Sequence, residues 1–101
     1  PEAEKNSDPS WFGFPIKIKE NSKFKRKDLI NHLTNNKIGT RLLFAGNLTK
    51  QPAYLNKNFR VESELNTTDL IMNNTFWVGI QPALGEEELS FTAKTIKNFF
   101  K

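Results

Sequence analysis

The apolar residues of this sequence come in short segments whose spacing changes along the chain, and this change constrains the fold most. In SWFGFPIKIKE (residues 10–20) large apolar residues alternate with small or charged ones, which is the period of a β-strand. In EEELSFTAKTIKNFFK (residues 86–101) the period becomes helical, with acids in the first turn, lysines in the last, and a stripe made by Leu89, Ala93, Ile96 and Phe100. Both periods in one short chain predict a small α+β domain.

The first alternating segment carries an apolar side chain at every second position. Because successive strand residues point to opposite sides of a sheet, these side chains are expected to share one buried face; they are Phe12, Phe14, Ile16 and Ile18. Pro15 has no backbone N–H, so it predicts an edge strand or a ladder interrupted at that residue.

A helix is predicted between residues 24 and 36, where Leu29, Ile30 and Leu33 have helical spacing. Lys25, at the expected N-cap, is a poor capping residue. His32 lies beside the apolar stripe and is interpreted as an ordinary exposed residue, because no second histidine or cysteine could join it in a metal site.

The stretch GTRLLFAGNLTKQPAY (residues 39–54) predicts a short buried strand over residues 40–45 that runs into a structured loop. The Gly46-Asn47 pair favours a turn, and Pro52 prevents continuation as a helix or central strand.

A short helix over residues 69–74 is expected next, capped by Thr67 or Thr68, and residues 76–80 predict another strand. The resulting order is β-α-β-α-β-α. It indicates an α+β fold in which a small sheet of about three strands is covered on one side by helices.

Composition narrows the class of protein. A chain of 101 residues fits one domain, and the polar residues 1–10, with two prolines, predict a linker before a domain at residues 11–101. Cysteine is absent, which excludes thiol catalysis and iron–sulfur ligation within this chain. No apolar run approaches the roughly 18 residues of a membrane span, so we expect a soluble, cytoplasmic protein with no membrane contact.

Basic residues outnumber acidic ones by 15 to 11, and six of them fall between residues 17 and 27. This basic window fits a solvated edge strand and helix start. A surface for nucleic acid or another polyanion is the alternative reading.

The sequence contains no recognisable catalytic constellation. Its acidic residues at predicted helix starts, Asp28, Asp69 and Glu86–Glu88, are explained by the helix dipole. Several polar and aromatic residues near the predicted loops remain unexplained. Each of them could have a structural role, or together they could line a cleft; they are Trp11, Phe12, Arg41, Asn47, Gln51 and Tyr54.

Four stretches, NSDPSWFGFPI, GTRLLFAGNLTKQPAY, NTTDLIMNNTFWVGI and the FF near the end, resemble the C-terminal domain of the RfbH-type lipopolysaccharide biosynthesis proteins. These are the CDP-4-keto-6-deoxyglucose 3-dehydrase group of the DegT/StrS aminotransferase-like family, which has the fold-type I architecture of pyridoxal phosphate enzymes. The resemblance runs from Asn6 to the end of the chain.

The resemblance implies a pyridoxamine- or pyridoxal-phosphate enzyme that removes the 3-hydroxyl of a nucleotide-linked keto sugar toward O-antigen dideoxyhexoses. It places the cofactor contacts and the iron–sulfur cysteines in a large domain that precedes this segment. These residues alone would therefore bind no cofactor and would be inactive without that domain. Dehydrase and aminotransferase activity stay open, and the full-length protein is expected to be a homodimer.

Carried over by matching positions, the resemblance puts Phe12 near the cofactor and Arg41, Asn47 and Gln51 on the loop that faces the substrate cleft. It assigns no catalytic residue and no metal ligand to this chain. Leu70 stands where relatives often have an active-site arginine, and the QPALG stretch before the last helix lacks a threonine cap. A different class of function, an independent polyanion-binding module, would show affinity that falls steeply with salt.

Overall fold

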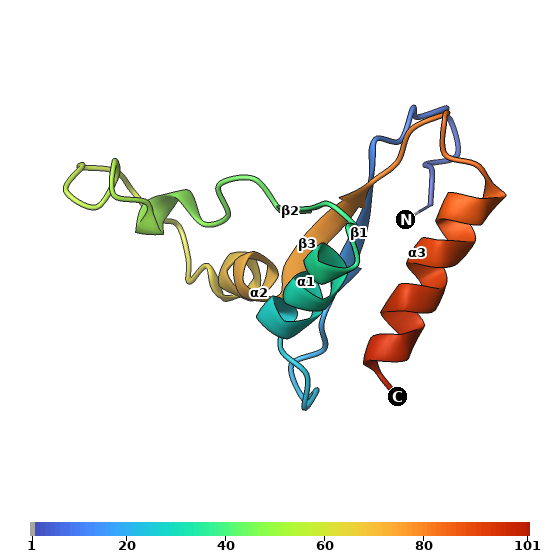
Figure 1. Cartoon of the computed structure of the whole chain (residues 1–101). Helices are drawn as coiled ribbons and strands as arrows, with labels where there is room; N and C mark the ends of the chain where they lie inside the picture. Colours follow the sequence, from blue (N-terminus) through green and yellow to red (C-terminus); the bar gives the residue numbers. More distant parts are fainter. Residues whose placement is uncertain (1) are drawn as a thin grey trace.

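The computed structural model describes residues 2–101 and confirms the predicted α+β fold (Figure 1). Pro1, part of the predicted linker, lies outside the described residues. The elements follow the predicted order, with one short 3-10 helix, η1, in addition: β1 (Gly13–Lys17), α1 (Arg26–Asn35), β2 (Thr40–Leu42), η1 (Leu48–Lys50), α2 (Asn66–Asn74), β3 (Thr75–Gly79) and α3 (Glu86–Phe99).

The three strands form one antiparallel sheet in the order β1-β3-β2. β1 is therefore an edge strand, as Pro15 predicted. The register places Pro15 and Arg41 on either side of Trp77, so these three residues share one face of the sheet. Phe76 lies on the opposite face, between Ile16 and Leu42.

The core lies on the Phe76 face. Phe76 of the central strand is fully buried with Leu29 and Leu33 of α1, and Ile18 and Val78 complete the buried cluster. α3 adds Ile96 and Phe99, which are half-buried against it. The helical spacing of Leu29 and Leu33 thus covers the sheet on one side, as predicted.

The predicted buried face of the first strand is wrong at its beginning. Ile18 is buried and Ile16 half-buried, but Phe12 and Phe14 are exposed. Phe12 precedes β1, and its ring packs edge-on against Trp77, with centroids 5.3 Å apart and planes at 86°. The alternation therefore breaks where the strand ends.

The predicted buried strand over residues 40–45 is also wrong in length and burial. β2 ends at Leu42, whose side chain is exposed, as is that of Phe44. Phe44 has φ 49°, a left-handed conformation that cannot continue a strand, and its N–H donates to the Leu42 carbonyl at 2.8 Å.

The predicted start of α1 agrees with the structure, whereas that of α2 does not. Lys25 is the N-cap of α1 and makes no capping hydrogen bond, as expected. α2 begins at Asn66, three residues before the predicted start, so Thr67 and Thr68 lie inside its first turn and cap nothing. The opposite end of α2 is held by a long-range contact: the Arg26 guanidinium donates to the carbonyls of Met72 (2.6 Å) and Thr75 (3.2 Å), where α2 passes directly into β3.

The expectation that His32 is exposed is wrong. Its side chain is half-buried between α1 and α3, with Nε2 3.1 Å from the Thr95 carbonyl and the ring 5.4 Å from that of Phe99. His32 is therefore a helix-packing residue. Its partners lie more than 60 residues away, which explains why its own surroundings in the sequence gave no sign of them.

Candidate functional site

The loop after β2 is organised around Asn47, one of the residues expected at the cleft. Asn47 is only 2% exposed. Its Oδ1 accepts from the Thr49 N–H (3.0 Å) and the Thr49 hydroxyl (2.7 Å), which caps η1, and its Nδ2 donates to Asp69 Oδ1 at 2.7 Å. All of these bonds are internal, so the amide of Asn47 holds the loop onto α2.

Asp69 receives a second partner from the same loop. Lys50 Nζ lies 2.6 Å from Asp69 Oδ2. The hydrogen bond from Lys50, and after it the one from Asn47, lower the pKa of the Asp69 carboxyl below its ordinary value of 3.8, because both favour the ionised form. The sequence had assigned Asp69 to the helix dipole alone. Its contact with Asn47, 22 residues away, has no local signal.

Two further contacts close the loop. Gln51 Nε2 donates to the Ala45 carbonyl at 2.6 Å, so this predicted cleft residue bridges the two ends of the turn. Gly46 has φ 64° and lies so close to Met72 that an added Cβ would meet the Met72 Cγ at 2.3 Å. The loop from Ala45 to Gln51 is therefore fixed by its own bonds and by α2.

Arg41 and Phe12 lie apart from that loop, near Trp77. The Arg41 side chain is exposed, and its Nη1 donates to the carbonyl of the adjacent Thr40 at 3.0 Å. Phe12 contacts one side of the Trp77 ring, and Trp77 Nε1 donates to the Leu42 carbonyl at 3.2 Å. The structure thus brings Phe12 and Arg41 to the neighbourhood of Trp77, and brings Asn47 and Gln51 together elsewhere. Trp77 was not singled out from the sequence, where it was only part of the strand predicted over residues 76–80.

We expect Asn47→Ala to lower the free energy of unfolding by about 2 kcal/mol, because it removes the cap of η1 and leaves buried partners without a hydrogen bond. Urea unfolding followed by tryptophan fluorescence measures the loss. Asn58→Ala, an exposed position in the same part of the chain, is the matched control and should change little. A loss no larger than that of the control would contradict the anchoring role.

The lowered pKa of Asp69 predicts how stability depends on pH. A carboxyl whose pKa is depressed in the folded state stabilises the fold above the unfolded value of 3.8, and this contribution is lost as pH falls through the folded pKa. We therefore expect wild type to exceed Asp69→Asn in stability at pH 6, and the difference to shrink below pH 4. Thermal unfolding at pH values from 6 to 2.5 tests this, and a difference that stays constant with pH would contradict it.

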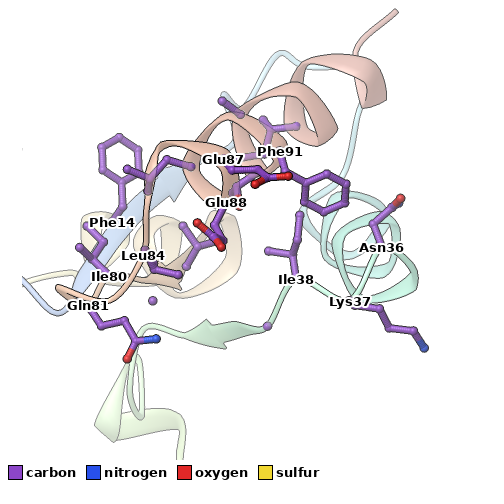
Figure 2. A pocket seen from close by; sticks show the side chains of 17 residues that line it. Phe14, Asn36, Lys37, Ile38, Ile80, Gln81, Leu84, Glu87, Glu88 and Phe91 are labelled. Carbon is purple, nitrogen blue, oxygen red and sulfur yellow. The ribbon is translucent and has the colours of Figure 1, made fainter.

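An open groove of about 1100 Å³ lies between α3 and the end of the sheet (Figure 2). Its walls are mostly apolar, with Phe14, Ile38 and Phe91 among them and the Glu87 and Glu88 carboxylates at its side. A second hollow of about 600 Å³ is lined by Tyr54 and Phe59. Phe12, Arg41, Asn47 and Gln51 line neither hollow.

Residues 2–101 contain no group of three or more His, Asp or Glu side chains placed to hold a metal ion. Within the same range no helix is long and apolar enough to cross a membrane. A pyridoxal phosphate cofactor would need a cradle of phosphate-binding donors. Of the expected site residues only Arg41 carries a positive charge, and its side chain is exposed, so these residues by themselves do not form such a cradle.

Comparison with known proteins gives a consistent set of relatives. The family model of the DegT/DnrJ/EryC1/StrS aminotransferases matches residues 1–97. Lipopolysaccharide biosynthesis protein RfbH of Salmonella typhimurium is 54% identical over 100 residues, which is 99% of this chain and 23% of that protein. A dTDP-4-dehydro-2,6-dideoxy-D-glucose 3-dehydratase of Saccharopolyspora spinosa is 40% identical over 99 residues, covering 98% of this chain and 21% of that enzyme.

The fold has a solved counterpart. The crystal structure of a GDP-4-keto-6-deoxymannose-3-dehydratase with a trapped PLP-glutamate geminal diamine matches with a TM-score of 0.79 and 23% identity. That match covers 92% of this chain and 24% of the solved one. The chain therefore spans less than a quarter of the length of these relatives. With its family model matched over nearly every residue, the chain belongs to the DegT/DnrJ/EryC1/StrS aminotransferase family.

Proposed function

We propose that these 101 residues are the small C-terminal domain of a longer nucleotide-sugar 3-dehydratase that acts in lipopolysaccharide biosynthesis. The 54% identity to RfbH over nearly the whole chain is the observation that carries this proposal. The second relative, itself a sugar 3-dehydratase, and the fold of the solved 3-dehydratase support the same reaction. The residues described here would border the cleft, and a cytoplasmic location would suit nucleotide-sugar substrates.

When bound in the longer protein, pyridoxamine or pyridoxal phosphate would supply the chemistry at the sugar carbon. The residues of this chain would position the substrate. Arg41 presents a guanidinium suited to a phosphate or carboxylate, and Phe12 presents an aromatic edge beside Trp77. Asn47 and Gln51 would act through the loop that they hold. An iron–sulfur cluster and a homodimer of the full-length protein remain proposals from the family resemblance.

The test is an assay of the full-length protein, supplied with cofactor, against CDP-, dTDP- and GDP-linked 4-keto-6-deoxy sugars. Loss of the 3-hydroxyl from any of them, detected by mass spectrometry, supports the proposal. Incorporation of an amino group would make the protein an aminotransferase. If a folded, cofactor-loaded protein carried out neither reaction, the proposed dehydratase function would be overturned.

The role of Arg41 has its own expected result. If its guanidinium contacts the substrate, Arg41→Ala should lower kcat/KM by about tenfold or more, as expected for the loss of a charged hydrogen bond. Arg60→Ala is the matched control, because Arg60 lies in an exposed loop and pairs with Glu62. Equal activity of the two variants would contradict the proposed contact between Arg41 and the substrate.

Polyanion binding through the basic window is the alternative function. The structure uses Arg26 of this window to hold the α2–β3 junction, which takes one cation away from the open surface. Binding of a DNA oligonucleotide whose affinity falls steeply with salt would favour this alternative.

A further inference from the structure

Most of the positive charge of the chain lies at one end of the molecule. Two segments far apart in the sequence meet there: the loop between β1 and α1, and the last turn of α3 (Figure 1). The Phe24 ring joins them, because its centroid lies 5.1 Å from that of Phe99 and 5.1 Å from that of Phe100. We call this region the basic end and define it by its seven exposed lysines, which are Lys17, Lys19, Lys23, Lys25, Lys27, Lys97 and Lys101.

The charge of the basic end is not neutralised by neighbouring acids. Residues 17–28 and 97–101 hold eight basic side chains, Arg26 included, against two acidic ones, so their net side-chain charge is +6. The whole chain carries +4, and the other residues together therefore carry −2. In the described residues 2–101, the ion pairs are formed by Lys50 and Arg60, and none involves a lysine of the basic end. The positive potential is thus concentrated at one end and faces solvent.

The basic end fits a broad anionic surface better than a nucleic-acid strand. Proteins that bind single strands combine a basic groove with aromatic rings that are open for stacking. Here Phe100 packs edge-on against both Phe24 and Phe99, at interplanar angles of 88° and 85°, so the three rings occupy one another. The seven lysines line neither the groove beside α3 nor the smaller hollow. The guanidinium of Arg26, the group best suited to a single phosphate, is bonded to backbone carbonyls at the α2–β3 junction.

Phe100 adds an apolar contact to the basic end. Its side chain is 42% exposed and precedes Lys101, while Lys23 Nζ lies 5.1 Å from the centroid of the Phe24 ring. Lysines around an exposed aromatic side chain are typical of protein surfaces that lie on a bilayer, where the ring enters the headgroup region and the ammonium groups meet anionic lipids. The expectation of no membrane contact was based on the lack of a spanning run, and a surface contact needs no such run.

We propose that the basic end binds the surface of a bilayer that contains anionic phospholipids and so holds the longer protein at a membrane. The proposal does not depend on the dehydratase function. Each lysine close to such a bilayer increases binding by about fivefold, and the attraction is weakened by salt. Several lysines acting together, with Phe100 among them, are expected to give measurable but reversible binding.

The experiment measures cosedimentation of the full-length protein with sucrose-loaded vesicles. Vesicles of phosphatidylglycerol and phosphatidylcholine in equal parts are compared with vesicles of phosphatidylcholine alone. A variant with Lys23→Glu and Lys25→Glu reverses two charges of the basic end. A variant with Lys5→Glu and Lys57→Glu is the matched control, because it makes the same change in net charge at exposed lysines elsewhere. Circular dichroism verifies that both variants are folded.

We expect the wild type to bind the anionic vesicles and not the neutral ones. The basic-end variant should bind the anionic vesicles about tenfold or more weakly, and the control variant within about twofold of wild type. Equal weakening by the two variants, or no binding of the wild type to anionic vesicles, would overturn the proposal. If the basic-end variant does not fold, Lys97→Gln with Lys101→Gln takes its place, with Lys5→Gln and Lys57→Gln as its control and the same outcomes.

Two further measurements separate a bilayer from other ligands. Raising the salt concentration from about 0.1 M to about 0.5 M should weaken vesicle binding, because salt screens exposed charges, and binding that ignores salt would contradict the proposal. A single-stranded DNA oligonucleotide is tested with the same variants. If it bound through the same lysines while anionic vesicles did not bind, the basic end would be a nucleic-acid site and the membrane proposal would be overturned.

Discussion

Phe76→Ala is expected to lower the free energy of unfolding by about 3–5 kcal/mol, which for a domain of this size removes much of its stability. Phe76 is fully buried in the central strand and contacts the cluster that also holds Leu29 and Leu33. Truncation removes this burial and leaves a cavity that neighbouring strands hold open. Urea unfolding followed by tryptophan fluorescence measures the effect, with Trp77 next to the altered residue.

Phe91→Ala provides the matched control, because the same side chain is exposed on α3. Its effect should stay within about 1 kcal/mol. A Phe76→Ala protein as stable as the control would mean that the core is elsewhere. Loss of the cooperative transition would count as an effect of the expected size or larger.

Gly46→Ala is expected to cost about 2–4 kcal/mol, from two independent causes. Its φ of 64° lies in the left-handed region, which is strained for a residue with a Cβ. The new methyl would also lie 2.3 Å from the Met72 Cγ, so the loop or α2 must move. The same unfolding measurement applies, and activity of the full-length protein should fall with it if the loop borders the cleft.

Gly39→Ala separates these causes from the general effect of adding a methyl group. An added Cβ at Gly39 meets nothing within 4 Å, and its φ lies outside the left-handed range. This variant should be neutral or slightly more stable, because alanine restricts the unfolded chain. Equal losses for the two glycines would contradict the role given to Met72.

The order of elements could be predicted because each depends on local spacing. The alternation from Trp11 to Ile18 and the stripe of Leu29 and Leu33 are visible in the sequence, and both produced the expected elements. Burial was less predictable. Phe12, Phe14 and Phe44 were expected in buried strands, but all three side chains are exposed, and Phe14 lines the open groove beside α3.

In the candidate site, too, local features could be predicted and long-range contacts could not. The turn at Gly46-Asn47 could be expected from residue type, and the structure has Asn47 capping η1 there. Its bond to Asp69 joins residues far apart in the sequence, so no local pattern reveals it. The assignment of Phe12 and Arg41 to a cleft came from family resemblance, and it stays a prediction that the activity of the Arg41→Ala variant tests.

The central strand of this sheet is the last one to be synthesised. β1 and β2 do not pair with each other. Each forms its backbone hydrogen bonds with β3, which lies between them, so neither can pair before β3 has been synthesised. Gly13 must find Gly79 across most of the chain, and such long-range closure slows folding. On the ribosome, the residues before Thr75 would therefore emerge with open strand edges and an exposed Phe44. Co-translational protection by a chaperone should matter most during that interval.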